Sequence, residues 1–108
     1  MTSLDKIYVI SEASHIEHVY KQLKGLPKEN ILVEPARRGT ASCVALALAT
    51  LKKRKLEDEA MLVIWADHLI RDSQGFVATA LRAGEVAESE KRIVYIGVEP
   101  TYASTGLG

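Results

Sequence analysis

Four short runs of apolar and β-branched residues recur along this chain, separated by more polar segments. A continuous apolar run of about four to eight residues is typical of a strand that is buried on both faces of a sheet. The third run, Met61 to Ala66, stops abruptly at the charged Asp67. The sequence therefore predicts four strands, at residues 7–10, 31–33, 61–66 and 93–98.

Between these runs, apolar residues recur at the spacing of an amphipathic helix. The first helix is expected to follow Ser14 and Glu17, whose separation matches a capping box. It is expected to end before Gly25 and Pro27, because glycine and proline both stop helices.

Two more helices complete the pattern. The second is expected to use Thr40 as its N-cap and to end in the basic cluster 52–55, where cations favour the negative helix terminus. The third is expected to start at Asp72 or Ser73 and to extend to about Ala87. The order βαβαβαβ predicts an α/β fold with a mostly parallel sheet of about four strands and helices on its faces.

The length and composition are those of a single globular domain, with 108 residues of which 47% are hydrophobic. The 14 basic and 14 acidic residues cancel, so no net field favours nucleic acid or an anionic membrane. No apolar stretch approaches the roughly 18 residues of a membrane-spanning helix, and nothing resembles a signal peptide. The single cysteine, Cys43, favours a reducing compartment, and we expect the cytoplasm.

The segment from Glu34 to Ala41 reads E-P-A-R-R-G-T-A and joins the second predicted strand to the second predicted helix. Backbone amides at a helix amino terminus favour anions, and Gly39 lets the backbone approach a ligand closely. Arg37 and Arg38 add planar, forked donors that suit a phosphate or a base edge. The alternative is an ordinary turn with a Thr40 cap and solvated arginines.

Asp67 follows the third predicted strand directly, with His68 beside it. Ligands of open α/β sheets bind at the carboxyl ends of the strands. Magnesium is commonly held by one or two carboxylates together with substrate phosphates, so Asp67 is a candidate Mg²⁺ ligand. The alternatives are that Asp67 caps the following turn and that His68 is a turn residue.

Three other features of the sequence bear on its possible chemistry. His15 and His18 have helical spacing but lack a third ligand, which favours solvated side chains over a metal site. No base stands beside Cys43 in the sequence, which favours packing over a nucleophilic role. The segment 99–108 is rich in Gly, Ser and Thr, so it is either a loop that presents amides and hydroxyls to a sugar or a plain connector.

Three motifs occur in order: E-P-A-R-R-G-T-A at 34–41, W-A-D-H-L-I at 65–70 and G-V-E-P-T-Y-A-S-T-G-L-G at 97–108. Together they resemble the middle of mannose-1-phosphate guanylyltransferases, whose counterparts read approximately E-P-x-x-R-x-T-A, P-A-D-H and P-T-x-P-E-T-G-Y-G. The chain departs from the family at Trp65, Ser104 and Leu107.

The resemblance implies a three-layer, Rossmann-like nucleotidyltransferase domain that uses Mg²⁺ to join GTP and mannose 1-phosphate into GDP-mannose and pyrophosphate. It implies that the guanine and ribose are bordered by Glu34, Pro35, Arg38, Gly39, Thr40 and Ala41. It implies that Asp67 ligates Mg²⁺ beside the nucleotide phosphates, with His68 next to the nucleotide. It implies that the hexose 1-phosphate is bordered by Thr105, Gly106 and Gly108.

The resemblance also implies that residues 1–108 form a partial nucleotidyltransferase domain. The family's glycine-rich activating loop, G-G-x-G-T-R-L, would precede Ile7, and a carboxyl-terminal part with a further metal-binding Asp would follow Gly108. Nucleotidyl transfer depends on positioning and charge neutralisation, so we expect weak or no turnover from these residues alone.

Two other interpretations remain open. One is a non-catalytic module of the same fold that binds a nucleotide weakly, and the other is a bare interaction domain without magnesium-dependent nucleotide binding. An unpaired sheet edge would also allow a homo-oligomer or association with a missing half of the fold.

Overall fold

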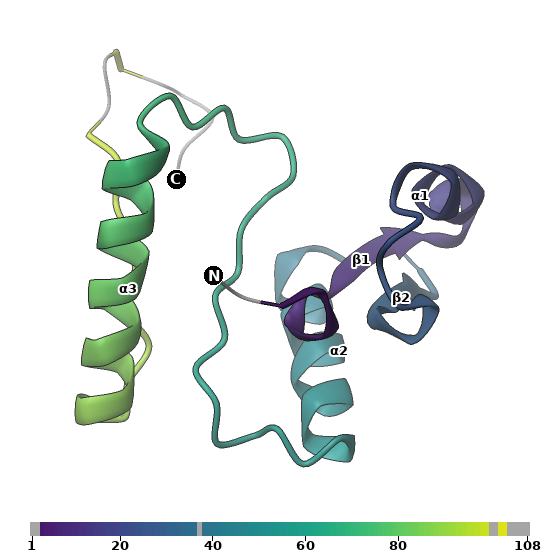
Figure 1. Ribbon diagram of the computed structural model, residues 1–108, viewed down its shortest axis with the longest axis horizontal. Helices are drawn as coiled ribbons and strands as arrows, with labels where there is room; N and C mark the ends of the chain where they lie inside the picture. The colour runs from purple at the N-terminus through teal and green to yellow at the C-terminus, as the bar shows by residue number, and fades with distance from the viewer. Residues whose placement is uncertain (1–2, 37, 100–101, 104–108) are drawn as a thin grey trace. The chain divides into compact units, whose positions relative to one another are not determined.

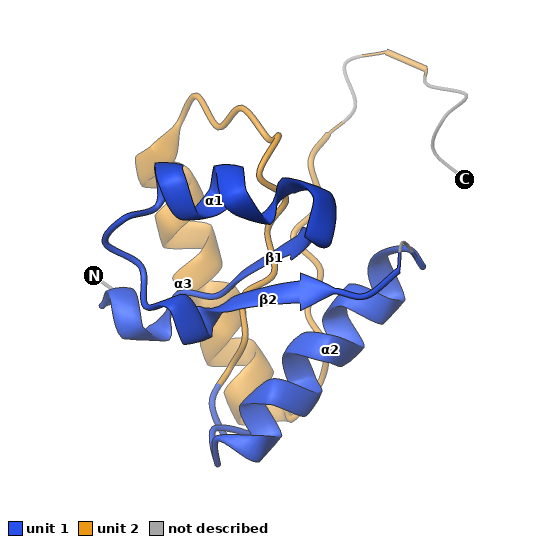
Figure 2. Ribbon diagram, turned by 90° about the vertical axis from the view of Figure 1, so that its right-hand side faces the viewer, with its two compact units in different colours: residues 1–59 blue, residues 60–108 orange. Residues whose placement is uncertain are grey.

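The computed structural model describes residues 3–36, 38–99 and 102–103, and it divides into two compact units, Met1–Glu59 and Ala60–Gly108 (Figures 1 and 2). In the described residues the first unit contains both strands and two α-helices, and the second contains one long α-helix. With η for a 3₁₀ turn, the elements are η1 (Leu4–Lys6), β1 (Val9–Glu12), η2 (Ala13–His15), α1 (Ile16–Gln22), η3 (Lys28–Asn30), β2 (Ile31–Glu34), α2 (Thr40–Lys53) and α3 (Ser73–Glu90).

The sheet of the first unit is formed by β1 and β2, which run parallel (Figure 1). The register pairs Val9 with Ile31 and Glu12 with Glu34, so both strands end at the same edge. Parallel neighbours need a crossover connection, and the segment containing α1 supplies it. α1 contacts β1, and α2 contacts β2 (Figure 2).

Asn30 is the most buried of the described residues, with 2% of its surface exposed, and it lies next to the buried Ile31. Its Nδ2 atom donates to the carbonyl oxygens of Asp5, at 2.8 Å, and Ile7, at 3.0 Å. A buried amide is tolerated when its hydrogen bonds are made. This side chain therefore ties the chain before β1 to the start of β2.

Arg54, the residue that follows α2, extends the same network. Its guanidinium donates to the Tyr8 hydroxyl at 3.1 Å, to Asn30 Oδ1 at 2.5 Å and to the Glu29 carbonyl. The guanidinium also lies 5.1 Å from the centroid of the Tyr8 ring, within cation–π range. These contacts hold the carboxyl end of α2 against the amino ends of both strands.

Within the first unit, the sequence predicted β2 and α2 closely but misplaced the start of α1. β1 covers Val9–Glu12, later than the expected 7–10. α1 begins at Ile16 after a 3₁₀ turn, and its N-cap, His15, makes no side-chain cap bond. The expected capping box is wrong, because the Ser14 hydroxyl donates instead to the Glu12 carboxylate at 3.3 Å.

In the second unit, the predicted third helix is confirmed as α3. Its N-cap is Asp72, whose Oδ1 accepts the Gly75 N–H at 2.9 Å. The helix continues past the expected Ala87 to Glu90 and ends where Lys91 adopts a left-handed conformation, with φ at 51°.

The strands predicted at 61–66 and 93–98 are not confirmed, since neither segment pairs with a strand in the described structure. Most of their apolar side chains are exposed, and the exposed fraction reaches 56% for Ile64 and 88% for Tyr95. An apolar run favours extended backbone locally, but a strand also needs a neighbour that completes its hydrogen bonds. Of the roughly four predicted strands, β1 and β2 are present.

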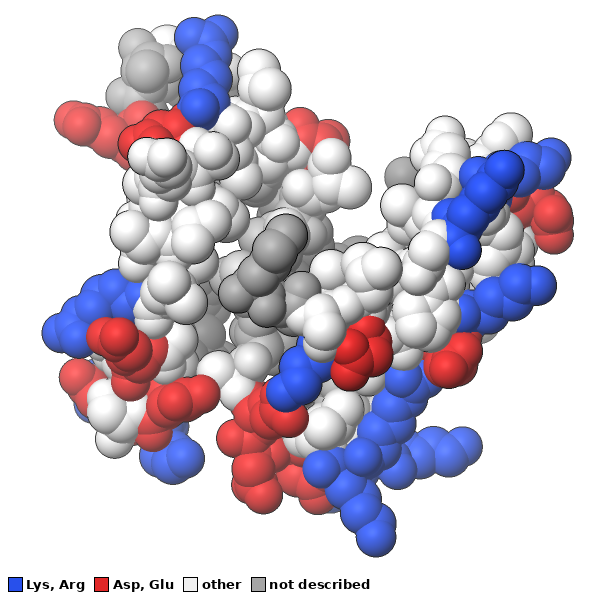
Figure 3. Space-filling model, in the orientation of Figure 1, with Lys and Arg blue, Asp and Glu red and all other residues white. Residues whose placement is uncertain are grey.

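Charged side chains of both signs lie on the face drawn in Figure 3, in keeping with the formal net charge of zero. Among the described residues, no helix combines the length and the apolar character that crossing a membrane requires.

Candidate functional site

The loop between β2 and α2 carries most of the predicted nucleotide-binding residues. β2 ends at Glu34, and the Glu34 Oε1 atom accepts the backbone N–H of Arg38 at 3.2 Å. Pro35 lies between them in an exposed bend, and Arg38 is also exposed. The bond closes a loop of five residues directly at the carboxyl end of the strand.

Gly39 sets the entry into α2. It is the N-cap, with φ at 83° and ψ at 176°, a conformation that only glycine adopts without strain. The expectation that Thr40 caps the helix is wrong, because Thr40 is the first helical residue and no side chain caps α2. Ser42 and Cys43 donate their N–H groups to the Gly39 carbonyl.

The amino-terminal end of α2 has features that suit the binding of an anion. The N–H groups of Thr40 and Ala41 belong to the first turn, where a helix provides no carbonyl partner. Both residues are exposed, as are Arg38 and Gly39. Unpaired amides and the positive end of the helix dipole, next to an arginine, form a common anion-binding arrangement.

Cys43 lies on the first turns of α2, next to Glu34. Burial, a hydrogen bond with the Glu34 side chain and the Glu34 negative charge together raise the pKa of the Cys43 thiol. A raised pKa keeps the thiol neutral and therefore poorly nucleophilic at pH 7. This agrees with the expectation that Cys43 packs and does not act as a nucleophile.

A second carboxylate stands beside the loop, and sequence reasoning missed it. Glu12 is the register partner of Glu34, so the parallel strands end in adjacent glutamates. Glu12 accepts a hydrogen bond from Ser14 and lies 4.0 Å from the His15 ring nitrogen. The signal in the sequence was weak, because placing Glu12 depends on a strand register that local pattern does not specify.

Asp67 and His68 belong to the second unit and are described within it. They lie in a turn in which the His68 N–H donates to the Trp65 carbonyl at 3.4 Å. The Asp67 side chain is exposed, and no group in the described residues donates a hydrogen bond to it. The carboxylate is thus accessible to an external cation.

The described residues contain no group of three or more His, Cys, Asp or Glu side chains that could hold a metal ion. A lone exposed carboxylate does fit Mg²⁺, because this ion takes one or two protein carboxylates and completes its shell with water and substrate phosphates. Asp67 offers such an oxygen donor. His15 is exposed in the first unit and faces Glu12.

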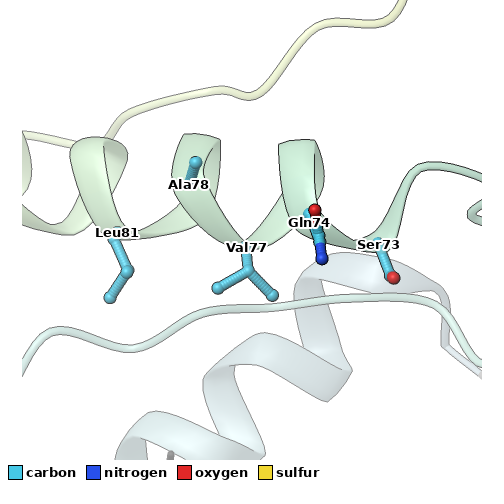
Figure 4. Close-up of a pocket in the computed structure, with 5 residues that line it drawn as sticks. All are labelled: Ser73, Gln74, Val77, Ala78 and Leu81. Carbon is cyan, nitrogen blue, oxygen red and sulfur yellow. The ribbon is translucent and has the colours of Figure 1, made fainter.

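The predicted sugar-binding residues and a surface pocket on α3 lie apart from the loop between β2 and α2 in the sequence. Thr105, Gly106 and Gly108 lie outside the described residues. A pocket along α3 is apolar, with Val77 and Leu81 pointing the same way from successive turns (Figure 4). It includes none of the residues predicted to bind nucleotide or metal, and its lining is Ser73, Gln74, Val77, Ala78 and Leu81.

The whole chain, residues 1–108, matches the family described as nucleotidyl transferase. The chain belongs to the nucleotidyl transferase family. The resemblance expected from the sequence is confirmed at this level.

The curated nucleotidyl transferases that the chain resembles are mannose-1-phosphate guanylyltransferases. The enzyme of Escherichia coli (strain K12) is 41% identical over 103 residues, which cover 93% of this chain and 21% of the relative. That of Salmonella montevideo is 42% identical over 103 residues, with 93% and 21% covered. The RfbM enzyme of Salmonella typhimurium is 36% identical over 109 residues, with 98% and 22% covered.

This nucleotidyl transferase chain spans about one-fifth of the length of the relatives it matches. No solved structure gives a significant match to it.

Proposed function

We propose that this chain forms part of a nucleotidyltransferase that joins GTP and mannose 1-phosphate into GDP-mannose and pyrophosphate. The observation that carries the proposal is the geometry of the β2–α2 loop. Gly39 turns the backbone into α2, whose first residues, Thr40 and Ala41, are exposed next to Arg38, and within the described residues no hydrogen-bond partner is present for their N–H groups. The likeness to mannose-1-phosphate guanylyltransferases supports the choice of guanine and mannose.

In this proposal the loop borders the nucleotide. Exposed amides of Thr40 and Ala41 bind anionic or carbonyl oxygens, and Arg38 supplies a planar, forked donor for a phosphate or a base edge. Gly39 lets the ligand approach the backbone, while Pro35 stiffens the loop by fixing its own φ. Binding and orientation of this kind are the main contribution that a protein makes to nucleotidyl transfer.

Asp67 is the residue that would hold Mg²⁺, together with the nucleotide phosphates. When bound, Mg²⁺ neutralises phosphate charge and orients the reacting groups. The neighbouring His68 borders the nucleotide in this proposal, and its backbone N–H already closes the turn that presents Asp67.

The proposal also includes a larger sheet than the structure describes. The exposed apolar segments 61–66 and 93–98 have strand-like composition, and pairing them in the complete domain would give the expected sheet of about four strands. Thr105, Gly106 and Gly108 would then border the hexose. We also propose that the protein works in a reducing compartment, the cytoplasm, which suits its single cysteine. The open edges of the sheet would allow it to associate with a second copy of the chain.

The test uses the fact that the chain aligns with a segment of a longer enzyme. Residues 1–108 replace the matching segment of the Escherichia coli (strain K12) relative, and pyrophosphate release is measured with GTP, mannose 1-phosphate and Mg²⁺. We expect turnover that Asp67→Asn lowers by at least about 100-fold. The control is Asp58→Asn, an exposed aspartate in a turn of the first unit.

A folded chimera without turnover would contradict the proposal, and so would equal activities of the Asp67→Asn and Asp58→Asn proteins. Circular dichroism and gel filtration establish folding of each chimera before the assay. The chain alone is expected to give weak turnover or none.

The second candidate is a non-catalytic module that binds a nucleotide or another chain. The observation in its favour is the exposure of large apolar side chains, among them Leu62, Ile64 and Tyr95, which is a feature of surfaces that contact another chain. Equilibrium binding of GTP to the 108-residue chain, with and without Mg²⁺, distinguishes the two. Magnesium-dependent binding together with an inactive chimera supports the module, and an absence of binding supports a bare interaction domain.

A further inference from the structure

We propose that Glu34 is a positioning residue of the nucleotide loop, whose carboxylate holds the loop in shape and does not itself contact the ligand. It does so through the Arg38 N–H at one side and the Cys43 side chain at the other. This inference rests on the proposed function, because it assigns a role within the same loop.

The geometry places Glu34 where it can control the whole segment. It is the last residue of β2 and half-buried, and its backbone is held by pairing with Glu12 of β1. From this anchored position, Oε1 accepts the N–H of Arg38, four residues later, at 3.2 Å. The bond fixes the residue immediately before Gly39, and Gly39 sets the direction of α2.

The second contact comes from α2 itself. Cys43 lies one turn into the helix, and its thiol is close enough to the Glu34 carboxylate for that group to add to the effect of burial in raising the thiol pKa. The thiol is protonated at pH 7 and can therefore donate to the carboxylate. Glu34 thus connects the strand end, the loop and the first turn of the helix.

Charge explains why the same carboxylate is better suited to holding the loop than to touching a nucleotide phosphate. A carboxylate facing a phosphate would repel it, whereas a carboxylate near the amino end of a helix is favoured by the helix dipole. The Arg38 N–H already takes Oε1. In this arrangement the exposed amides of α2 and the Arg38 guanidinium are left for the anion.

The experiment compares Glu34→Gln and Glu34→Ala with Glu57→Ala in the 108-residue chain. Glutamine keeps an oxygen that can accept the Arg38 N–H, whereas alanine removes it. Glu57 is an exposed glutamate beyond the far end of α2, so its loss makes the same charge change away from the loop. Two quantities are measured: hydrogen exchange of the Arg38 amide by NMR, and GTP binding in the presence of Mg²⁺.

We expect Glu34→Ala to accelerate Arg38 amide exchange and to weaken GTP binding, each by about ten-fold, the value of one lost hydrogen bond. In Glu34→Gln the exchange rate of the Arg38 amide and the affinity for GTP should stay close to those of the unmodified chain. Glu57→Ala should change neither quantity. A destabilised fold would accelerate exchange at all amides, so an effect confined to residues 38–41 marks a positioning role.

Equal loss of GTP binding in Glu34→Gln and Glu34→Ala, with Arg38 exchange unchanged in the glutamine variant, would show direct ligand contact and overturn the inference. Unchanged Arg38 exchange in Glu34→Ala would also overturn it. If the unmodified chain binds no GTP, the proposed function fails for this chain. The role of Glu34 in holding the loop is then tested by the exchange rate of the Arg38 amide alone.

Discussion

Asn30 Oδ1 accepts a hydrogen bond from Arg54 Nη1 at 2.5 Å, which joins the residue before β2 to the residue after α2. The two residues are 24 positions apart in the sequence. Between them lies the entire nucleotide loop, so this contact fixes the far ends of the two elements that present the loop. Its loss should therefore affect the stability of the first unit.

Replacing Asn30 with alanine should lower the free energy of unfolding by about 2–3 kcal/mol, because it leaves buried polar partners unsatisfied. Asn30 donates to two carbonyl oxygens in addition to accepting from Arg54. Urea unfolding, followed by circular dichroism, measures the change. The control is Gln22→Ala at an exposed position, which should stay within about 0.5 kcal/mol. Equal effects of the two substitutions would argue against the network.

Arg54→Lys tests whether the geometry of the guanidinium matters beyond its charge. Arg54 binds three different acceptors and stacks on the Tyr8 ring, and an ammonium group cannot reproduce this arrangement. We expect a loss of about 1–2 kcal/mol in the free energy of unfolding. Lys53→Arg, at the neighbouring exposed position, makes the reverse exchange and should have almost no effect. A neutral Arg54→Lys would mean that the charge alone suffices.

Gly39→Ala and Gly84→Ala should change stability in opposite directions. Neither glycine has a heavy atom within 4 Å of an added Cβ, so space does not distinguish them. Gly39 has φ at 83°, so alanine there should cost about 1–3 kcal/mol. Gly84 lies inside α3, where alanine should gain up to about 1 kcal/mol. Urea unfolding and helix content by circular dichroism measure both, and destabilisation by Gly84→Ala would contradict this expectation.

The pKa of the Cys43 thiol, measured from the pH dependence of its alkylation by iodoacetamide, should fall in Glu34→Gln relative to the unmodified chain. Burial is the first cause of the raised pKa, and the hydrogen bond and charge of Glu34 add to it. Glutamine removes the charge. A pKa that is unchanged would mean that burial alone protects the thiol.

The same shift has a consequence for stability. Because the folded state favours the protonated thiol, this contribution is fully present below the thiol pKa of the unfolded chain. It is lost as the pH rises from about 8.5 through the raised folded value. Cys43→Ser, which does not titrate in this range, should remove that part of the pH dependence. Urea unfolding between neutral and alkaline pH measures it.

The loop between β2 and α2 shows which features of the candidate site a local sequence pattern can predict and which it cannot. The sequence predicted that β2 ends before Pro35, because proline fixes its own φ and restricts the residue before it, and that a helix starts near Thr40, a residue type that often caps helices. It did not predict that Gly39, and not Thr40, is the N-cap. It also gave no sign that Glu34 binds the Arg38 amide, since a side chain's partner depends on the path of the loop.

The sequence by itself determined the family, the α/β class and the helices α2 and α3, because motif residues, helical period and cap residues act over a few positions. Tertiary structure alone decided the pairing of Glu12 with Glu34 and the contact of Asn30 with Arg54, because both join residues that are far apart in the chain. Dependence on residues far apart in the chain also explains why the apolar runs at 61–66 and 93–98 do not form strands in the described structure. Composition favours strands there, but strand formation requires a hydrogen-bonding neighbour, which no local pattern supplies.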